Sequence, residues 1–391
     1  MRLSFSFRVD KNDKIYSKLL RMSQVSKDLY NQALFEIKCN YEKTGKILSY
    51  YELDAKMKTR MNLQGDINYC LLPAQVAQQT LMLVSQNVKS FFSAKASYKE
   101  HPQKYQAPPQ FPHFLPKDGH FVLVFTNQKA VISSDGAIQL MKDVIIKIPK
   151  LEFEKYKQYF IKEELQRIVP LFRQIRIVPK FNGAFFNVEL IYEKDELNKA
   201  LDVNRVASLD FGVDNLITLV DNKMEEENRE PIIINGKPIK SINQFYNKRR
   251  AEIQAELSIN GRGRERTLSG FKRTSQSVMK ITDWRNVVCL VLINAVMSLK
   301  SLMDEANANN NEKIKDYMHK TSRFVINYCM SHNLGHIVIG KNDGWKQSIN
   351  VGKRNNQTFV AIPFDKLIQQ IQYKGGLRSK LLSVANTVSR H

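Results

Sequence analysis

One carboxylate in this sequence stands where metal-dependent chemistry could use it. Asp210 follows the largely apolar segment Val206–Leu209 and precedes Phe211-Gly212, a pattern that predicts a strand ending at a turn. Nucleases that use two metal ions need several carboxylates at such a place, because one metal activates water while the other stabilises the leaving oxygen. An aspartate beside a glycine is also an ordinary turn residue. Asp210 is therefore a candidate metal ligand that would need further carboxylates beside it.

Amide side chains form a second group with possible chemistry. Apolar residues at helical spacing from Val76 to Phe92, directly after Pro73, predict a helix. Amides and one lysine lie on its other face: Gln75, Gln78, Gln79, Gln86, Asn87 and Lys89. Such amides can bond bidentately to the edge of a base, or they can simply be solvated.

The charge of the chain points to a polyanionic partner. Sixty Lys and Arg residues against 38 Asp and Glu give a net charge of +22. Nucleic acid is the natural partner, because each neutralised phosphate releases counterions. The alternatives are a merely soluble basic surface and an anionic membrane, although no basic amphipathic anchor stands out. The candidate phosphate contacts are Lys89, Lys248, Arg249, Arg250, Arg262, Arg264, Lys272 and Arg273.

The cysteines and the apolar runs argue against a zinc-binding protein and against a membrane-spanning one. Cys39, Cys70, Cys289 and Cys329 include no Cys-x-x-Cys pair, so we expect reduced thiols and no zinc site of the usual spacing. The longest apolar run, Val287–Leu299, is shorter than the ~20 residues of a membrane span. We expect a cytoplasmic protein that requires no cofactor and binds no membrane.

The first half of the chain divides by periodicity. Apolar residues recur every three or four positions from Asp13 to about Ser97, which predicts helices. After a proline-rich stretch, period-two segments predict the strands Phe121–Phe125, Ala130–Ile132, Val144–Ile148, Gln174–Val178 and Phe185–Ile191. Several short strands favour a small barrel. The alternating segment Arg2–Val9 would join it, which makes the helical region an insertion.

A third region begins near Asn204 and predicts an α/β domain. Strands are expected at Val206–Asp210 and Asn215–Val220, followed by a hairpin signal at Pro231–Pro238. A helix is expected at Asn243–Leu257, then a loop at Gly261–Arg264. Two further helices, a last strand and a helix-like tail are expected at Ile281–Leu302, Glu312–Ser331, Ile337–Gly340 and Gly376–Val388. Strands, then helices, then a strand is the order of an RNase H-like core.

Several longer stretches carry a family resemblance. They are Asn243–Ala251, His319–Arg323, Ile337–Gln347 and Asn355–Pro363, with Leu72–Gln79 and Phe125–Gln128 in the first half. Together they resemble the TnpB (OrfB) family of transposon-encoded RNA-guided DNA nucleases, which are related to type V CRISPR effectors. The resemblance spans nearly the whole chain.

The resemblance implies an α+β multidomain fold. Residues 1–9 with 105–200 would form a wedge-type β-barrel, and residues 10–104 a helical recognition domain inserted in it. Residues 201–391 would form a RuvC-like (RNase H-like) α/β domain that is incomplete.

The expected incompleteness rests on a departure from the family. In this branch, the segment after the equivalent of Tyr373-Lys374 continues into a second catalytic Glu, a four-cysteine zinc module and a third catalytic Asp. Here the sequence ends at His391 without them. One vestigial carboxylate, Asp210, cannot hold a two-metal centre, so bound Mg²⁺ would be vestigial at most. The resemblance thus implies a nuclease-dead, TnpB-like transcription repressor, prokaryotic and nucleoid-associated.

The family also implies how target DNA would be recognised. A guide RNA would pair with the target, while the protein reads a short flanking motif in double-stranded DNA. Family positions that contact this motif correspond to Tyr50, Gln78, Thr126 and Asn127, and Gln75 lies on the same helix face. Gln78 suits adenine and the Thr126 methyl suits thymine, which favours an A/T-rich motif. One protein per guide is expected.

Two alternatives stay open at this point. An active nuclease could use relocated acids such as Asp316 or Asp343 together with Asp210. A decayed transposon remnant would instead be unstable or free of RNA, although the regular spacing of the Gly376–Val388 tail argues against random decay.

Overall fold

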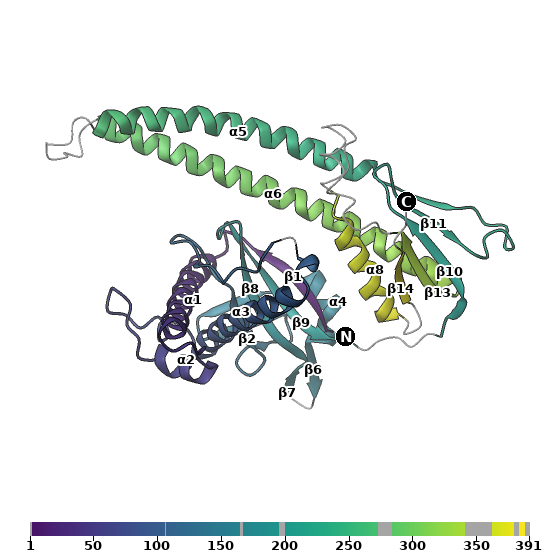
Figure 1. Cartoon of the computed structure of the whole chain (residues 1–391), viewed down its shortest axis with the longest axis horizontal. Coiled ribbons are helices and arrows are strands. Elements are labelled where there is room, and N and C mark those ends of the chain that lie inside the picture. Colours follow the sequence, from purple (N-terminus) through teal and green to yellow (C-terminus); the bar gives the residue numbers. More distant parts are fainter. Residues whose placement is uncertain are drawn as a thin grey trace. The chain divides into compact units, whose positions relative to one another are not determined.

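The chain forms two compact units, Met1–Lys194 and Asp195–His391, in a computed structural model (Figure 1). The structure describes residues 2–105, 107–164, 167–194, 200–272, 284–340, 362–378 and 383–387. Within these ranges, the side chains of residues 163–167, 259–297 and 377–391 are outside the description. Each unit has its own hydrophobic core, so we treat the two separately.

A four-stranded antiparallel sheet organises the first unit. Its order is β1 (Arg2–Val9), β9 (Phe185–Glu193), β8 (Phe172–Lys180) and β2 (Leu123–Thr126). Alternating apolar residues of β1, such as Phe5 and Val9, are buried against the core, as the period of a half-buried strand requires. The N-terminal strand thus lies in a sheet completed by strands that follow residue 122.

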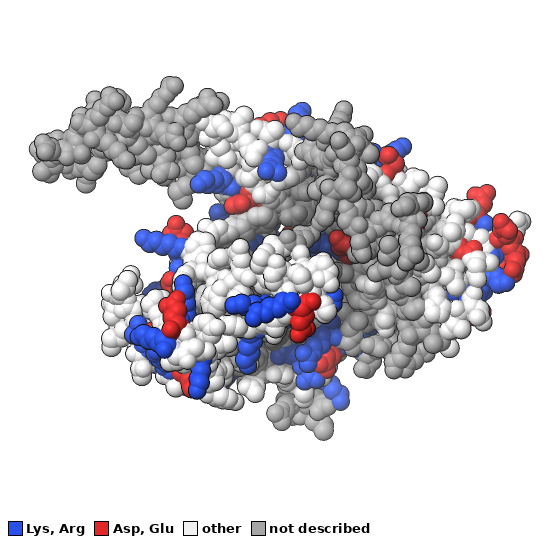
Figure 2. Space-filling model, viewed as in Figure 1, with Lys and Arg blue, Asp and Glu red and all other residues white. Residues whose placement is uncertain are grey.

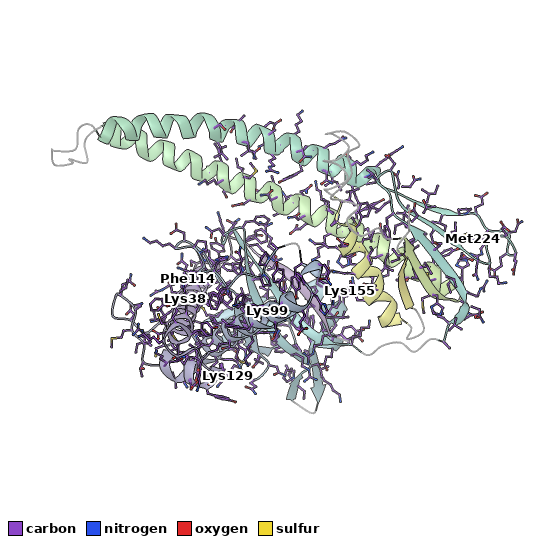
Figure 3. All side chains as sticks on the ribbon, viewed as in Figure 1. Lys38, Lys99, Phe114, Lys129, Lys155 and Met224 are labelled. Atoms are coloured by element: carbon purple, nitrogen blue, oxygen red, sulfur yellow. The ribbon has the colours of Figure 1, made fainter. Side chains whose placement is uncertain are left out.

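Three α-helices lie between β1 and β2 in the sequence. They are α1 (Tyr16–Thr44), α2 (Tyr50–Met57) and α3 (Ala74–Glu100). A capping box begins α2: Ser49 N donates to Glu52 Oε2 at 2.8 Å, and Glu52 N donates to Ser49 Oγ at 3.3 Å. The apolar faces of the helices join the core, and side chains fill the space between helices and sheet (Figure 3).

The structure does not confirm the expected barrel. The predicted strands divide between two open sheets of the first unit, and none of the three sheets formed by its described residues closes on itself. The short strands β3 (Val131–Ile132), β4 (Ala137–Met141) and β5 (Val144–Lys147) pair with each other, and β6 (Ile161–Glu164) pairs with β7 (Arg167–Pro170), so neither group extends the larger sheet. The remaining elements of this unit are η1 (Pro102–Lys104) and α4 (Lys150–Phe160).

A five-stranded mixed sheet organises the second unit. Its order is β12 (Ile232–Asn235), β11 (Asn215–Asp221), β10 (Asp202–Asp210), β13 (Leu334–Gly340) and β14 (Ser383–Thr387). The strands β10, β11 and β12 are antiparallel, whereas β13 and β14 run parallel to β10. The order of strands, helices and strand is the one that the sequence predicts for an RNase H-like core.

The helices of the second unit correct three sequence predictions. They are α5 (Lys237–Lys272), α6 (Trp284–Ser331) and α8 (Phe364–Arg378). The expected loop at Gly261–Arg264 is wrong, because α5 continues through it, and the two expected helices are the single α6. The pairing of α5 with α6 (Figure 1) explains both, since tertiary packing overrides the weak helix propensity of glycine and asparagine.

The tail is the third correction. Helix-like spacing was expected across Gly376–Val388, but α8 ends at Arg378 and β14 follows. β14 pairs in parallel with β13, with Ile337 opposite Val384. A short apolar run is compatible with a helix or a strand. Here it forms a strand, which pairs with the edge of β13 that β10 does not occupy.

A buried ion pair at the end of β11 is hydrogen-bonded to a tyrosine of α6. The Asp221 side chain is fully buried and accepts hydrogen bonds from Arg229 Nη1 at 2.7 Å and from Tyr328 Oη at 2.9 Å. Burial alone would raise the pKa of this carboxyl, but the bonds from Arg229, the Lys223 backbone and Tyr328 outweigh it and hold the pKa below its usual value. The ionised pair adjoins the core that contains Met224, labelled in Figure 3.

A buried lysine joins α8 to α6. Lys374 Nζ donates to His319 O at 2.8 Å and to Ser322 Oγ at 2.6 Å. Burial, with a contribution from Arg323, lowers the pKa of Lys374 to about 8. Both acceptors are uncharged, so the ammonium form carries a desolvation cost in the folded chain.

The stability contribution of Lys374 should therefore depend on pH. The folded chain releases the Lys374 proton at about pH 8, before the unfolded chain does at its ordinary value of 10.5. The free energy of unfolding of the wild type, relative to Lys374→Met, should consequently rise between pH 8 and pH 10.5. Urea denaturation of both proteins at pH 7.5 and 9.5 measures the change. Lys366→Met, at an exposed lysine of the same helix, is the control; an unchanged Lys374 difference would contradict the prediction.

No helix built from the described residues is both long enough and apolar enough to cross a membrane.

Candidate nucleic-acid interface

The carboxyl edge of the second sheet carries Asp210. Asp210 is the exposed last residue of β10, and its partner across β11 is Thr218. On the other side, Leu209 pairs with Ile339 in parallel β13, which places Gly340 next to Asp210. Carboxyl ends of parallel strands meet at one edge, so these positions are where a shared metal site would be built. The neighbouring strand supplies a glycine there.

The described residues leave room for a side chain at this glycine. Among them, a Cβ built on Gly340 would meet only the Leu209 carbonyl oxygen, at 3.9 Å, which is ordinary van der Waals contact. Within the described ranges, no group of three or more His, Cys, Asp or Glu residues is arranged to hold a metal ion.

The structure describes one of the two acids that an active nuclease could use together with Asp210, namely Asp316, but not the other, Asp343. Asp316 is an exposed residue of α6 whose carboxylate pairs with Lys320 Nζ one turn away, at 2.7 Å. It is a surface residue. Asp343 lies outside the described residues.

Two of the predicted DNA-contacting residues contact each other in the first unit. Gln75, at the start of α3, accepts a hydrogen bond from Thr126 N at 3.1 Å, and its amide donates to Thr126 Oγ1. The amide thus bridges α3 to the end of β2 in the way that it could bond a base. Asn127 follows directly, half-buried, with its backbone N–H bonded to Arg173 O at 3.3 Å.

A tyrosine that the sequence did not single out links the other two. Tyr69 donates from its hydroxyl to Asp54 Oδ1 at 3.0 Å and also interacts with Gln78 and Tyr50. Burial and these carboxylate interactions raise the pKa of Tyr69 to about 12, so it stays a hydrogen-bond donor at neutral pH. Tyr50 and Gln78 therefore share one polar cluster. Only the contacts across α2, the 58–73 segment and α3 reveal it.

The bridge by Gln75 predicts a structural role that can be measured. Gln75→Ala leaves the Thr126 N–H without its acceptor, so the free energy of unfolding should fall by about 1 kcal/mol. Gln79→Ala is the matched control on the same helix, because the Gln79 side chain makes a single long contact to the described residues, to Met82 Sδ at 3.6 Å. Chemical denaturation followed by circular dichroism measures both. Equal stability of the two variants would show that the bridge contributes nothing.

The predicted phosphate contacts lie in both units. Lys248, Arg249 and Arg250 are exposed on α5, where Arg249 Nη1 pairs with Glu252 Oε2 at 3.1 Å, and Lys89 is exposed on α3. Figure 2 shows Lys and Arg spread over the visible described surface, with Asp and Glu among them. Arg262, Arg264 and Lys272 belong to α5 by their backbone, but their side chains, and Arg273 entirely, lie outside the described residues.

The cysteines that the structure describes are free thiols. Cys70 is exposed, Cys39 is half-buried, and Cys329 is buried. Burial, followed by the charge of Asp221, raises the pKa of Cys329 to about 12. That thiol is therefore protonated and unreactive at neutral pH.

Comparison with known proteins gives a family model and a fold. Residues 189–296, which include β10 to β12, α5 and the first part of α6, match the OrfB_IS605 model, described as "Probable transposase". A search of curated proteins found no match.

Among solved structures, Cas12f1 bound to single-guide RNA and target DNA has a TM-score of 0.50 at 10% identity, covering 96% of this chain and 73% of that chain. A Cas12f ternary complex has a TM-score of 0.31 at 10% identity, covering 97% and 72%. C2c1 of Alicyclobacillus acidoterrestris with single-guide RNA has 0.37 at 9%, covering 97% and 62%. The segment 189–296 is thus similar to the OrfB_IS605 domain of TnpB-type proteins, and the chain has a fold similar to that of Cas12f1.

Proposed function

We propose that this protein binds DNA sequence-specifically under the direction of a guide RNA. The match of residues 189–296 to the OrfB_IS605 model carries the proposal. Two observations support it: the fold similarity to Cas12f1, which was solved with guide RNA and target DNA, and the net charge of +22. A charge of this size favours a polyanionic partner.

The protein binds its target without cutting it and acts as a transcription repressor by occupying DNA. Support comes from the carboxyl edge of the second sheet, where Asp210 has Thr218 on one side and Gly340 on the other. A single carboxylate holds Mg²⁺ weakly, and a two-metal centre requires several. Asp210 is then a vestige of a nuclease site, and no cofactor is needed for binding.

Recognition of the flanking motif belongs to the polar surface around the start of α3. Gln78 and Asn127 offer amides to base edges, and Tyr50, like Gln78, interacts with Tyr69. Gln75 and Thr126 hold the end of β2 against α3 through their mutual bonds. The partner is double-stranded DNA with a short A/T-rich motif, bound by one protein per guide.

Purification of the full chain from its host under nuclease-free conditions tests the proposal. RNA of uniform length should co-purify, and sequencing should show a constant segment joined to a segment that matches a genomic target. DNA containing that target should bind only when the RNA is present. A protein that is free of RNA, or that binds DNA equally well after RNase treatment, would overturn the proposal.

A further inference from the structure

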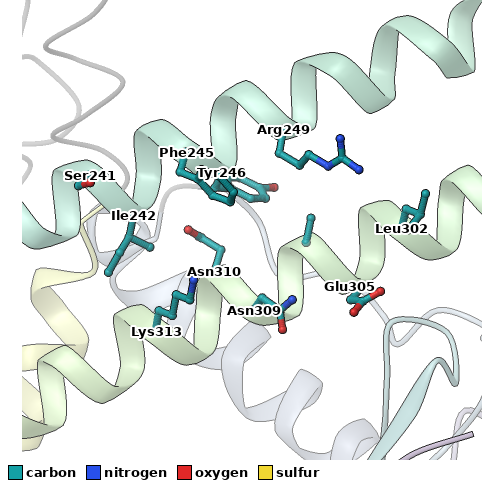
Figure 4. Close-up of a pocket in the computed structure, with 11 residues that line it drawn as sticks. Ser241, Ile242, Phe245, Tyr246, Arg249, Leu302, Glu305, Asn309, Asn310 and Lys313 are labelled. Atoms are coloured by element: carbon teal, nitrogen blue, oxygen red, sulfur yellow. The ribbon is translucent and has the colours of Figure 1, made fainter.

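A cavity of about 490 Å³ lies between α5 and α6 of the second unit (Figure 4). Its size falls within the ~300–1,000 Å³ of small-molecule sites. Phe245 and Tyr246 of α5 lie opposite Leu302 and Asn310 of α6. The cavity combines a flat apolar wall with a few polar groups, the composition typical of a site for a planar ligand.

Phe245 is the feature that most needs an explanation. Its side chain is 71% exposed, although it lines the cavity and a helix pair could have buried it. Tyr246, next to it, is held in place because its hydroxyl donates to Asn307 Oδ1 of α6. The exposed aromatic face is therefore presented by a fixed segment of helix.

Asn310 provides a second, independent observation. Its Oδ1 atom is buried and has no hydrogen-bond partner within the described structure. Figure 4 shows the Asn310 side chain extending from α6 toward α5 across the cavity. A buried acceptor without a donor is costly, so an N–H or O–H group that a ligand brings to Asn310 Oδ1 would be stabilising.

Charge at the rim selects the class of ligand. Arg249 and Lys313 line the cavity with Glu305, so two cations face one carboxylate in its lining, and Arg249 also pairs with Glu252 of α5, at 3.1 Å. The excess positive charge suits a ligand that carries phosphate. A planar ring with N–H donors and an attached phosphate is a nucleotide.

We propose that this cavity receives one unpaired nucleobase of the RNA bound to the protein. The base stacks on Phe245, its N–H group donates to Asn310 Oδ1, and its phosphate lies near Arg249. This inference rests on the proposed function for the RNA itself, and it adds the site where a base leaves the stack. Stacking of a base on an aromatic side chain requires an unpaired nucleotide, so a fully paired duplex would gain nothing from the cavity.

Substitutions of Phe245 test whether the cavity binds a nucleobase or a protein partner. Binding of the full chain, freed of RNA, is measured to a single-stranded 20-nucleotide RNA and to an RNA duplex of equal length. Phe245→Leu keeps an apolar side chain but loses the aromatic face, so affinity for the single strand should fall roughly 5- to 150-fold. Phe245→Tyr should retain the affinity for the single strand. Affinity for the RNA duplex should be unchanged in both Phe245 variants. Phe324→Leu, at an exposed phenylalanine of α6 outside the cavity, is the control.

Asn310→Ala gives a readout in which stability and binding move in opposite directions. Removing the unpartnered oxygen should leave the melting temperature of the RNA-free protein equal or higher, because a cost is removed. Affinity for the single strand should nevertheless fall several-fold. A drop in melting temperature with unchanged affinity would make Asn310 a structural residue and overturn its assigned role.

The outcomes distinguish this inference from the proposed function. If single-strand affinity is high in the wild type and equal in Phe245→Leu, the cavity does not hold a base, while RNA binding stands. If Phe245→Leu matches the wild type but Phe245→Asp abolishes self-association or capture of a helical protein, the cavity is a protein-docking groove. If the wild type binds no RNA, both proposals fail.

Discussion

Replacing Arg229 with Met is expected to lower the free energy of unfolding by about 3–5 kcal/mol, because it leaves a buried carboxylate without its counter-ion. The Asp221 side chain is fully buried, and Arg229 binds both of its oxygens, at 2.7 and 2.9 Å. The remaining donors, Tyr328 Oη and the Lys223 backbone N–H, cannot neutralise the charge. The loss should be largest at neutral pH and should shrink in acid, since protonation of Asp221 removes the unpaired charge. This follows from its depressed pKa in the folded wild type.

Tryptophan fluorescence reports this unfolding selectively. The two tryptophans of the chain, Trp284 and Trp345, both lie in the second half of the sequence. Tyr328→Phe is a graded comparison that removes one hydrogen bond to a charged group and should cost about 1.5–3 kcal/mol. The double variant Asp221→Asn with Arg229→Met should recover part of the loss. A change below about 1 kcal/mol for Arg229→Met would show that solvent reaches the pair and that it behaves as a surface ion pair.

Raising the salt concentration from 50 to 200 mM is expected to weaken RNA binding by about 10³- to 10⁵-fold. This is the range for a protein that neutralises roughly 6–10 phosphates, and each neutralised phosphate releases counterions. The net charge of +22 and the exposed Lys89, Lys248 and Arg250 are the basis for phosphate binding on this scale. Filter binding of the co-purified RNA over a salt series gives the slope of log affinity against log salt.

Removing two positive charges tests which residues contribute to the salt dependence of RNA binding. Lys248→Gln with Arg250→Gln should lower its magnitude by about 2, because each substitution leaves one phosphate without its cationic partner. Lys320→Gln is the matched control on α6, because Lys320 is already paired with Asp316, at 2.7 Å. It should leave the slope nearly unchanged. A slope near zero for the wild type would mean that phosphate binding does not drive association, and the charge would then only describe a soluble surface.

The sequence predicted what local periodicity determines. Alternation in Arg2–Val9, Gln174–Val178 and Phe185–Ile191 placed β1, β8 and β9, and the strand-end position of Asp210 followed from the apolar run before it. Continuity of α6 through its asparagines could not be predicted, because their low propensity is overcome by packing against α5. The small barrel is not confirmed either, since which strands pair depends on contacts distant in sequence.

The contacts among the candidate site residues were predicted less completely than the helices and strands. The sequence indicated Gln75 and Thr126 as separate DNA-contacting candidates, but not that they bond to each other. It gave no signal for Tyr69, whose role appears only when Asp54, Gln78 and Tyr50 come together around it. The position of Gly340 beside Asp210 likewise depends on the parallel register of β10 and β13.

The most direct test of the central claim is the fate of target DNA in the complex. DNA labelled on both strands and carrying the sequence that matches the co-purified RNA is incubated with the complex in Mg²⁺ or Mn²⁺. It is then followed by retention on a native gel and by fragment length on a denaturing gel. We predict guide-dependent retention of DNA that stays full-length, with Asp210→Ala indistinguishable from the wild type. Guide-dependent fragments that disappear in Asp210→Ala would contradict the account and make the protein an active nuclease.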